Sequence, residues 1–384
     1  MGKGKYLKKQ KASTGKRIGR VVLVVLLVLL ILIGAVFAYV WSKLSLITYD
    51  DGSSKTPTAV IGTTPVPSDS STGIVDPTET EITVLETEPE ETIDVSGLTM
   101  ETAPIMSSGE LVEDKEVMNI LLLGTDELGQ GFNTNSRSDV IILVSINKRA
   151  QTVKLVSFSR GIAAPFMEGQ YKGKYEWITN LHRWGGANMV MMAIEECFKV
   201  ECDYFVRVNF NTVKTVVDAI GGVDIELTKK EADYMNWYNR NEVDVRTTTT
   251  QKDCVEGWNN LDGGMALHFA RLRRIDDDFA RMDRQRKVIL AAVNKLKGSD
   301  LMTLNNLADL ALPLIQTNMS TLEIAKLILY APTFLDSDFD QLEIPIDKSH
   351  SAMKVMSGAS GWALNYEKTN AALHEFLYGI DNVG

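Results

Sequence analysis

Seven Lys and Arg side chains crowd residues 271–287 of a chain whose formal net charge is -10. They are Arg271, Arg273, Arg274, Arg281, Arg284, Arg286 and Lys287. A local positive site in an acidic protein indicates a specific anion as its ligand. Arg presents a planar fork of N–H donors that matches the oxygens of a phosphate group. The cluster therefore predicts phosphate recognition by several convergent Arg side chains.

The position of these residues on the expected helix 278–297 supports that interpretation. One apolar stripe of this helix is formed by Met282, Ile289, Val293 and Leu296. At about 100° per residue, Arg281 and Gln285 fall inside the stripe near its start, while Arg284 and Arg286 flank it. Because a buried Arg needs a partner, these side chains either bind an anion or form structural ion pairs with nearby Asp residues. The sequence leaves both interpretations open.

Two carboxylates and two further Arg residues are expected at one edge of a sheet. Asp126 lies just past the first expected strand. Arg137 and Asp139 lie at the start of the second, and Arg160 lies just past the end of the third. The start of one strand of an antiparallel hairpin neighbours the end of the next, so Arg137, Asp139 and Arg160 should meet. Asp126 should approach the same edge through the loop 127–138. Carboxylates among Arg forks suit a phosphate or pyrophosphate bridged by Mg²⁺. Solvated ion pairs at surface turns are the alternative.

An uncharged run from Val21 to Trp41 follows a segment with eight Lys or Arg and no acidic residue. Roughly 20 apolar residues cross the hydrocarbon core of a bilayer as a helix. The basic segment favours a cytoplasmic N-terminus, which places the chain after Trp41 outside the cell. We therefore predict a single-pass protein of the cell membrane with an extracytoplasmic main domain. A signal peptide cleaved near Val36-Phe37-Ala38 is the competing interpretation.

Composition divides the whole chain into five parts. Residues 42–115 are rich in Thr, Ser, Pro and acidic side chains with few aromatics, which is typical of a disordered stalk. No basic face extends far enough to follow a nucleic-acid backbone, so nucleic acid is not expected as a partner. The predicted parts are a cytoplasmic tail (1–20), a transmembrane anchor (21–41), a stalk (42–115), a catalytic domain (116–298) and a C-terminal helical extension (299–384).

The order of the expected elements predicts an α/β fold, with a mixed sheet covered by helices. Strands are expected at 118–123, 139–146, 152–158, 203–209 and 223–227, the second and third forming a hairpin. Helices are expected at 187–198, 211–220, 264–274 and 278–297. The tail after residue 301 should add two helices, a strand at 342–346 and a last helix ending near Tyr378.

Other reactive residues carry weaker signals. The three cysteines, Cys197, Cys202 and Cys254, allow at most one disulfide, and buried thiols are the expectation for all of them. They lack the spacing of metal ligands and only four His are scattered along the chain, which argues against zinc. Ser157 and Ser159 have no His placed to activate them, which argues against a serine nucleophile.

Taken in order, several segments resemble the LytR-CpsA-Psr family of membrane-anchored cell-wall proteins of Gram-positive bacteria. The resemblance covers roughly residues 117–298. It is carried by Asn119-Ile120-Leu121-Leu122-Leu123-Gly124-Thr125-Asp126, Arg137-Ser138-Asp139, Ser157-Phe158-Ser159-Arg160, Val217-Asp218-Ala219-Ile220-Gly221-Gly222-Val223, Leu261-Asp262-Gly263-Gly264-Met265-Ala266-Leu267, Ala270-Arg271-Leu272-Arg273 and Asp278-Phe279-Ala280-Arg281-Met282-Asp283-Arg284-Gln285.

The resemblance implies a phosphotransferase that moves an anionic glycopolymer, such as teichoic acid or capsule, from a polyprenyl-pyrophosphate carrier to a sugar hydroxyl of peptidoglycan. It implies Asp126 and Asp139 as ligands of Mg²⁺, or alternatively Mn²⁺. It also implies that the pyrophosphate is held by Arg137, Arg160, Arg271, Arg273, Arg281, Arg284 and Gln285. The catalytic set would be Asp126, Asp139, Arg160, Arg281 and Gln285. The general base stays open between the two Asp side chains and a metal-bound water.

Two departures from the family pattern bear on this function. The family usually has Pro before Arg160 and Asp-Thr after it, whereas this chain has Ser159 and Gly161-Ile162. An Arg often found soon after Asp126 is replaced by Glu127-Leu128. The departures favour the rival interpretation of a non-catalytic carrier-binding sensor that attenuates the transcription of envelope genes. A peptidoglycan hydrolase would need a carboxylic acid pair without an Arg cage, and it ranks last.

Overall fold

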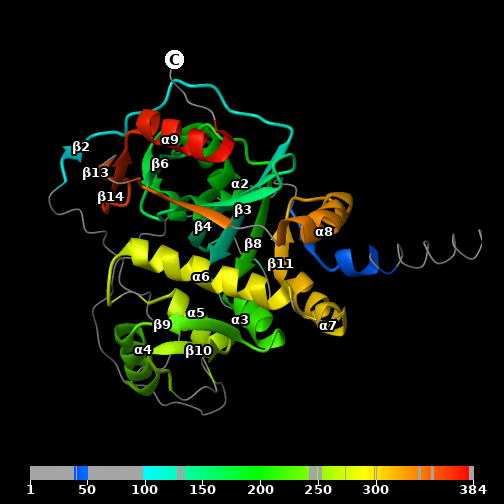
Figure 1. The fold of residues 1–384 in the computed structure, drawn as a ribbon. Helices are drawn as coiled ribbons and strands as arrows, with labels where there is room; N and C mark the ends of the chain where they lie inside the picture. The colour runs from blue at the N-terminus through cyan, green and yellow to red at the C-terminus, as the bar shows by residue number, and fades with distance from the viewer. Residues whose placement is uncertain are drawn as a thin grey trace, which may run out of the picture.

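A mixed sheet of seven strands forms the centre of the molecule (Figure 1). The computed structural model describes residues 39, 41–50, 98–127, 132, 135–241, 249, 253–272, 274–297, 299, 301–335, 339–346 and 350–379. In sheet order the strands are β1 (Thr48–Tyr49), β11 (Ile315–Thr317), β8 (Tyr204–Asn209), β3 (Val117–Thr125), β4 (Ser138–Asn147), β5 (Thr152–Phe158) and β12 (Phe339–Ile344). The β3–β4 and β4–β5 pairs are antiparallel, whereas β8 joins β3 and β12 joins β5 in parallel.

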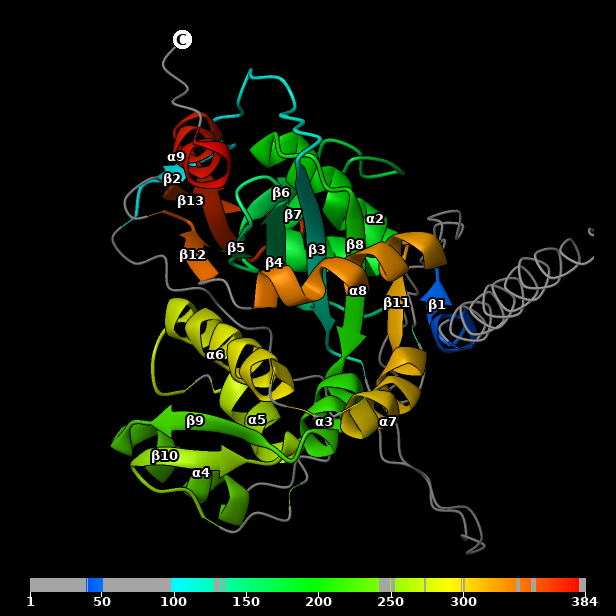
Figure 2. The ribbon, with the colours of Figure 1, turned by 45° about the vertical axis from the view of Figure 1, so that its right-hand side comes forward.

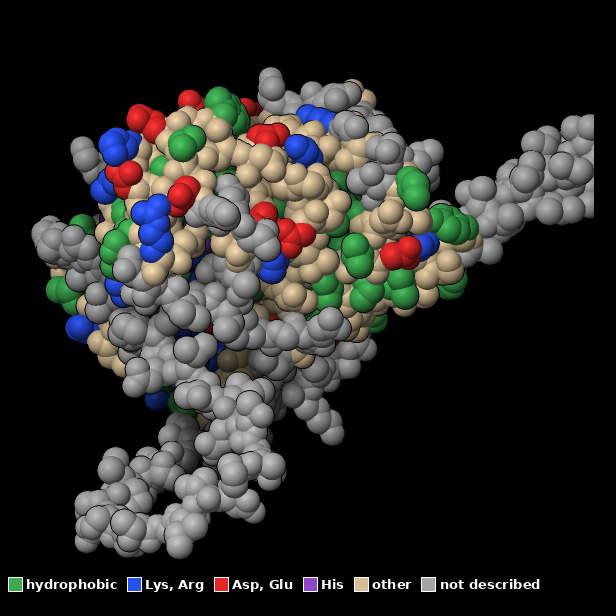
Figure 3. Space-filling model, turned by 90° about the horizontal axis from the view of Figure 1, so that it is seen from below, with side chains coloured by type: hydrophobic (Ala, Val, Ile, Leu, Met, Phe, Trp, Pro, Cys, Tyr) green, Lys and Arg blue, Asp and Glu red, His purple; other side chains and the backbone are tan. Residues whose placement is uncertain are grey.

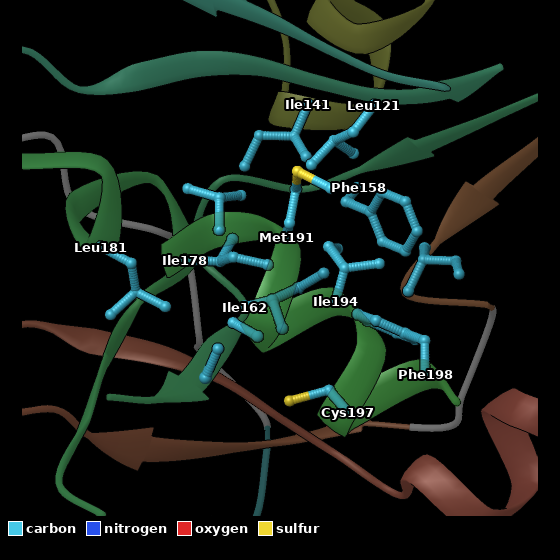
Figure 4. Packing of buried hydrophobic residues seen from close by; sticks show 14 of the residues in the cluster. Leu121, Ile141, Phe158, Ile162, Ile178, Leu181, Met191, Ile194, Cys197 and Phe198 are labelled. Carbon is cyan, nitrogen blue, oxygen red and sulfur yellow. The ribbon is translucent and has the colours of Figure 1, made fainter. Parts of the chain in front are cut away.

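Helices cover both faces of this sheet, which explains why its central strands are apolar on both sides. On one face, α2 (Ile178–Phe198) and α9 (Tyr366–Tyr378) pack against a core that includes Leu121 and Ile141. Figure 4 shows side chains of α2 directed toward those of β3, β4 and β5. On the other face, α6 (Asp278–Lys297) and α8 (Thr321–Leu335) pack against the alternate residues, such as Ile120 and Ile142.

A second, smaller lobe lies on the far side of α6 (Figure 2). Its own apolar core joins the two-stranded sheet of β9 and β10 to its helices, and α6 contributes Val288 to it. The elements of this lobe are α3 (Phe210–Ala219), β9 (Val223–Leu227), α4 (Lys229–Asn241), β10 (Gly257–Leu261), α5 (Gly263–Ala270) and α7 (Leu301–Ala311). Because α6 packs on both cores, it fixes the position of one lobe relative to the other.

Two small sheets complete the larger lobe. Their strands are β2 (Met100–Glu101), β13 (His350–Lys354) and β14 (Ser360–Leu364) in one sheet, and β6 (Ala163–Pro165) and β7 (Tyr175–Trp177) in another. A short 3₁₀ turn, η2 (Leu312–Leu314), leads into β11. The pair of β13 and β14 bridges to the turn after β5, because Trp362 N donates to Gly161 O at 2.8 Å.

The predicted α/β class is confirmed, and so are the strands β3, β4, β5, β8 and β9 and the hairpin of β4 and β5. The helix expected at 187–198 begins earlier, at Ile178, with non-helical backbone at Gly185 and Gly186. Helix α4 and strand β10 were not expected. The helix α4 has a low content of apolar residues, and β10 alternates Trp258 and Asn260 outward, so neither has a strong periodic signal.

Two predicted boundaries need correction. The C-terminal region 299–384 is not a helical extension, because β11 and β12 from this region are strands of the central sheet. Residues 42–50 and 98–115 of the predicted stalk pack on the fold: Leu44 is buried and β1 pairs with β11. The rest of the stalk, 51–97, lies outside the described residues.

The predicted membrane anchor, 21–41, lies outside the described residues except for Tyr39 and Trp41. In the part of the chain that the structure describes, no helix has the length and apolar character to span a bilayer.

A β-bulge at the end of β3 determines the direction of the chain toward Asp126. The register with β4 shifts between Gly124 and Thr125, so that Thr125 lies opposite Ser138. A Cβ atom at Gly124 would lie 2.8 Å from Cβ of Val140. The close approach of the two strands at this point therefore requires glycine.

We expect Gly124→Ala to lower the free energy of unfolding by about 1–3 kcal/mol, since the added methyl overpacks against Val140. Chemical denaturation of the detergent-solubilised chain measures this loss. The double variant Gly124→Ala/Val140→Ala should recover part of it, because the opposing side chain is then smaller. Equal stability of the single variant and the parent would contradict the steric argument.

Candidate functional site

The first carboxylate of the site lies just past the bulge of β3. Asp126 accepts two hydrogen bonds from Arg137, one from the backbone N at 2.8 Å and one from Nε at 3.0 Å. The backbone N of Asp126 in turn donates to Arg137 O at 3.1 Å. The hairpin topology thus brings these two residues together as expected. Both side chains are partly exposed, at 21% and 24%.

A chain of ion pairs connects the second carboxylate to helix α6. Arg281 Nη2 donates to Asp139 Oδ2 at 3.2 Å, and both side chains are only 4% exposed. Arg281 Nη1 also lies 3.8 Å from Oδ1 of Asp278, the first residue of α6. The same Asp278 carboxylate accepts from Arg160 Nε at 3.1 Å. The end of β5, the start of β4 and the start of α6 therefore converge through alternating positive and negative groups.

Ser159, which replaces the usual Pro of the family, takes part in this chain. Its Oγ donates to Asp278 Oδ2 at 2.8 Å and accepts from Trp362 Nε1 of β14 at 3.1 Å. The altered segment after Arg160 is buried, since Ile162 is fully covered. The departure from the family pattern therefore adds a hydrogen bond to the group that orients Arg160.

The remaining predicted ligands lie at the same end of the sheet or outside the described residues. Arg271 ends α5 with its guanidinium carbon 4.7 Å from the ring centroid of Phe210. Phe210 follows Asn209, which pairs with Thr125, so Arg271 approaches the strand end that carries Asp126. Gln285 is buried one turn after Arg281 on α6. The placement of Arg273 is not described.

Arg284 and Arg286 form buried structural ion pairs, the alternative that the sequence left open for the cluster. Arg284 donates to both oxygens of Asp276, at 2.7 and 2.6 Å, and to Leu272 O at 2.9 Å. Arg286 donates to Ser157 Oγ at 3.0 Å, to Gln341 Oε1 at 2.7 Å and to Glu343, and so ties α6 to β5 and β12. Both side chains are buried, because α6 is covered on several sides.

A second buried ion pair beside the site was not predicted. Arg207, in the middle of the apolar strand β8, donates to both oxygens of Glu127 at 2.9 and 2.8 Å. It also donates to Gln316 Oε1 and Ser136 Oγ, both at 2.9 Å. Burial lowers the pKa of Arg207, and the Glu127 carboxylate opposes this shift. An Arg inside an apolar strand needs such a partner, which was a signal available in the sequence.

The loop between β3 and β4 is also held by a neutral histidine. His182 Nδ1 lies 2.8 Å from Ser136 O, which can only accept, so Nδ1 carries the proton. Burial, followed by the nearby charge of Arg207, lowers the pKa of His182 to about 3. The imidazole therefore stays neutral at physiological pH and fixes the segment next to Arg137.

The donor set of Asp126 and Asp139 fits a hard divalent cation. Mg²⁺ is usually bound by one or two carboxylates together with waters and substrate phosphates. Across the described ranges no group of three or more His, Cys, Asp or Glu gathers as a metal site. Asp126 and Asp139 would supply the carboxylate oxygens for such a cation, and waters and phosphate oxygens would supply its other ligands.

The expectation for the cysteines is met in the described chain. Cys197, Cys202 and Cys254 are buried and form no disulfide.

The fold and this edge cluster define an α/β protein with an arginine–carboxylate site suited to an anion. The sequence model of the LytR_cpsA_psr family matches residues 77–375, and the chain belongs to this family. A Bacillus anthracis protein named polyisoprenyl-teichoic acid–peptidoglycan teichoic acid transferase TagU is 32% identical over 215 residues, 56% of this chain and 63% of that protein. The chain thus matches less than two thirds of that relative's length.

Solved structures share the fold. The protein gbs0355 from Streptococcus agalactiae has a TM-score of 0.56 at 20% identity, covering 68% of this chain and 88% of its own. A structure of the LytR-CPS2A-psr family protein YwtF (TagT) with bound octaprenyl pyrophosphate lipid has a TM-score of 0.51 at 21% identity, covering 74% of this chain and 99% of its own.

We expect Arg284→Leu to destabilise the protein by about 3 kcal/mol, because it leaves Asp276 and Glu231 without their buried partner. Arg149→Leu, at a side chain that is 77% exposed, is the matched control and should change stability little. Denaturant titration measures both. If Arg284→Leu kept the stability of the parent but lost affinity for pyrophosphate, the result would contradict a purely structural role. It would support the ligand role that the family resemblance implies.

The lowered pKa of His182 predicts a loss of stability in acid. Because the unfolded chain binds a proton near pH 6.5 and the folded chain only near pH 3, the free energy of unfolding falls as pH drops below 6.5. At pH 5 the loss from this residue is about 2 kcal/mol. Comparison of the parent with His182→Gln at pH 7 and pH 5 isolates the effect. A stability difference that does not change with pH would refute it.

Proposed function

We propose that this chain is a phosphotransferase that moves an anionic glycopolymer from a polyprenyl-pyrophosphate carrier to a sugar hydroxyl of peptidoglycan. The observation that carries this proposal is the run of ion pairs from Arg160 through Asp278 and Arg281 to Asp139. The relative from Bacillus anthracis is named for transfer of teichoic acid to peptidoglycan, and the TagT structure holds a polyprenyl pyrophosphate. Both names support the same substrate class.

The charges of the site suit a pyrophosphate better than a neutral ligand. The proposed site contains four guanidinium groups and three carboxylates, so one positive charge remains when all are ionised. The groups are those of Arg137, Arg160, Arg271 and Arg281, and of Asp126, Asp139 and Asp278. In our proposal Asp126 and Asp139 hold Mg²⁺, which would neutralise charge on the phosphate oxygens. Mn²⁺ could replace it, since both ions accept carboxylate oxygens.

The protein's own groups supply positioning. Asp278 accepts a hydrogen bond from Nε of Arg160 and also contacts Arg281. These contacts fix the planes of both guanidinium groups before the substrate binds. Such preorganised donors stabilise the charge that develops on a transferred phosphoryl group. Gln285, buried one turn after Arg281, would complete the set from the same helix. Arg284 is left out of this set, because Asp276 already binds it at both oxygens.

The location of the protein belongs to the same proposal. A basic N-terminal segment and the uncharged run 21–41 support a single-pass anchor, with the described domain outside the cell. The partners would then be the lipid-linked glycopolymer in the membrane and the peptidoglycan outside it.

We expect Arg160→Ala and Asp139→Asn each to slow polymer transfer by about 100-fold, the typical cost of removing one preorganised group in a transition-state site. The assay uses the full chain in lipid nanodiscs with Mg²⁺, a synthetic pyrophosphate-linked glycolipid and a peptidoglycan oligomer. Product is measured by mass spectrometry. Arg149→Ala is the control for the Arg→Ala change. The Arg149 side chain is exposed and lies in the turn between β4 and β5, at the opposite end of the hairpin from Arg160.

The same assay separates the rival functions. Binding of the glycolipid without any product would support the sensor interpretation. Unchanged rates in both site variants would reject the proposed site.

A further inference from the structure

We propose that one end of the domain, formed by residues 39–49, α7 and α8, lies directly on the surface of a phospholipid bilayer. This inference rests on the membrane anchor of the proposed function. It adds a defined contact face and an orientation. The first observation is that the chain just after the uncharged run does not leave the domain but packs on it. Tyr39 bonds Asn305, Lys43 pairs with Asp309, and Leu44 is buried.

The exposed apolar side chains of the molecule are concentrated at this end. Eight of the fourteen large apolar side chains that are exposed in the described chain lie in residues 39–49, α7 and α8. On α7 and α8, Met302 is 74% exposed, Leu310 52% and Leu322 61%. Seen from below, hydrophobic side chains gather at the end where α7 and α8 lie (Figure 3). A concentration of exposed apolar side chains of this kind marks a surface that is covered in the working protein.

The types of the exposed side chains and the sequence that precedes them identify a lipid bilayer as the partner of this surface. Tyr39, Trp41 and Tyr49 are exposed at 51%, 53% and 60%, and such amphipathic rings favour the headgroup level of a bilayer. The run of 21 uncharged residues from Val21 ends at Trp41, inside the patch. A helix of that length spans roughly 30 Å, the thickness of the hydrocarbon core. The patch thus begins where the chain would emerge from the lipid.

Charge pairing reduces the cost of placing this end against lipid headgroups. Lys43 and Asp309 neutralise each other within the patch. Glu323 of α8 accepts from Tyr204 Oη at 2.6 Å and from the backbone N of Ser320 at 2.7 Å, so its charge is already solvated by the protein.

The orientation that follows brings the candidate site close to the membrane. Strand β1 is the edge of the central sheet at this end, and the order from this edge is β1, β11, β8, β3. Three strand spacings separate β1 from β3, which is roughly 14 Å. Asp126 follows β3, so a carrier pyrophosphate would need to rise only a short way from the headgroup region. The height of the domain above the bilayer is then set by this face.

Fluorescence quenching on the full chain in nanodiscs tests the contact. Burial raises the pKa of Cys197 to about 12 and that of Cys254 to about 11, and it also raises the pKa of Cys202. The native cysteines are therefore poorly reactive toward a maleimide dye. Leu322→Cys and Leu310→Cys then carry the dye on the proposed face. Trp258→Cys, 70% exposed on the smaller lobe, is the matched control.

Lipids with a nitroxide at the headgroup should cause a loss of dye emission at positions 322 and 310 and little loss at 258. A nitroxide deep in the acyl chain should quench less, because interfacial contacts reach only about 5–10 Å into the bilayer. Equal quenching at all three positions, or none at 322, would overturn the inference. Crosslinking of 322 between two chains without quenching would also overturn it, in favour of a second copy. Adding Asp139→Asn should leave the quenching unchanged, so failure of the contact is distinguishable from failure of the proposed activity.

Discussion

The need to compensate buried guanidinium groups determines how this protein is assembled. Arg281 lies between Asp139 and Asp278 with almost no exposure, and such a charge is tolerated only where carboxylates reach it. Those carboxylates come from a strand start and a helix start that are far apart in the sequence. The pairing therefore requires the central hairpin and α6 to meet in one arrangement. The same groups that satisfy this requirement form the candidate site, so stability and ligand binding depend on shared contacts.

Helix α6 distributes its Arg residues between two tasks. Arg281 faces the strand edge, whereas Arg284 binds Asp276 in the smaller lobe and Arg286 binds the sheet beside β12. Helix α6 runs between the two lobes (Figure 1). The buried pairs of Arg284 and Arg286 fix the helix to both of them, and this holds Arg281 in place. A helix positioned by packing alone would allow small rotations. Ion pairs with fixed geometry on several sides restrict them, which is the precondition for a preorganised anion site.

Features that depend on a local sequence pattern could be predicted. Features that depend on pairing between residues far apart in the sequence could not. The hairpin register brought Arg137 to Asp126 because neighbouring strand ends meet whatever the rest of the fold does. A helical wheel could not show which neighbour covers each side of α6, so the sequence could not decide whether Arg284 and Arg286 bind a phosphate or form ion pairs. The pair of Arg207 with Glu127 depends on parallel pairing of β8 with β3, which has no local signal. A strand as short as β11 has too few residues to show a periodic pattern. For this reason the sequence does not indicate that the C-terminal region joins the central sheet.

The C-terminal region instead belongs to the site, and this bears on the altered segment around Arg160. Where the family usually has Pro, Ser159 receives a hydrogen bond from Trp362 of β14 and donates one to Asp278. Asp278 is the group that orients both Arg160 and Arg281. A strand of the C-terminal region thus supports the carboxylate that orients Arg160. A proline at position 159 has no hydroxyl and could make neither hydrogen bond, so the departure from the family pattern adds a contact to Asp278 at this point of the fold.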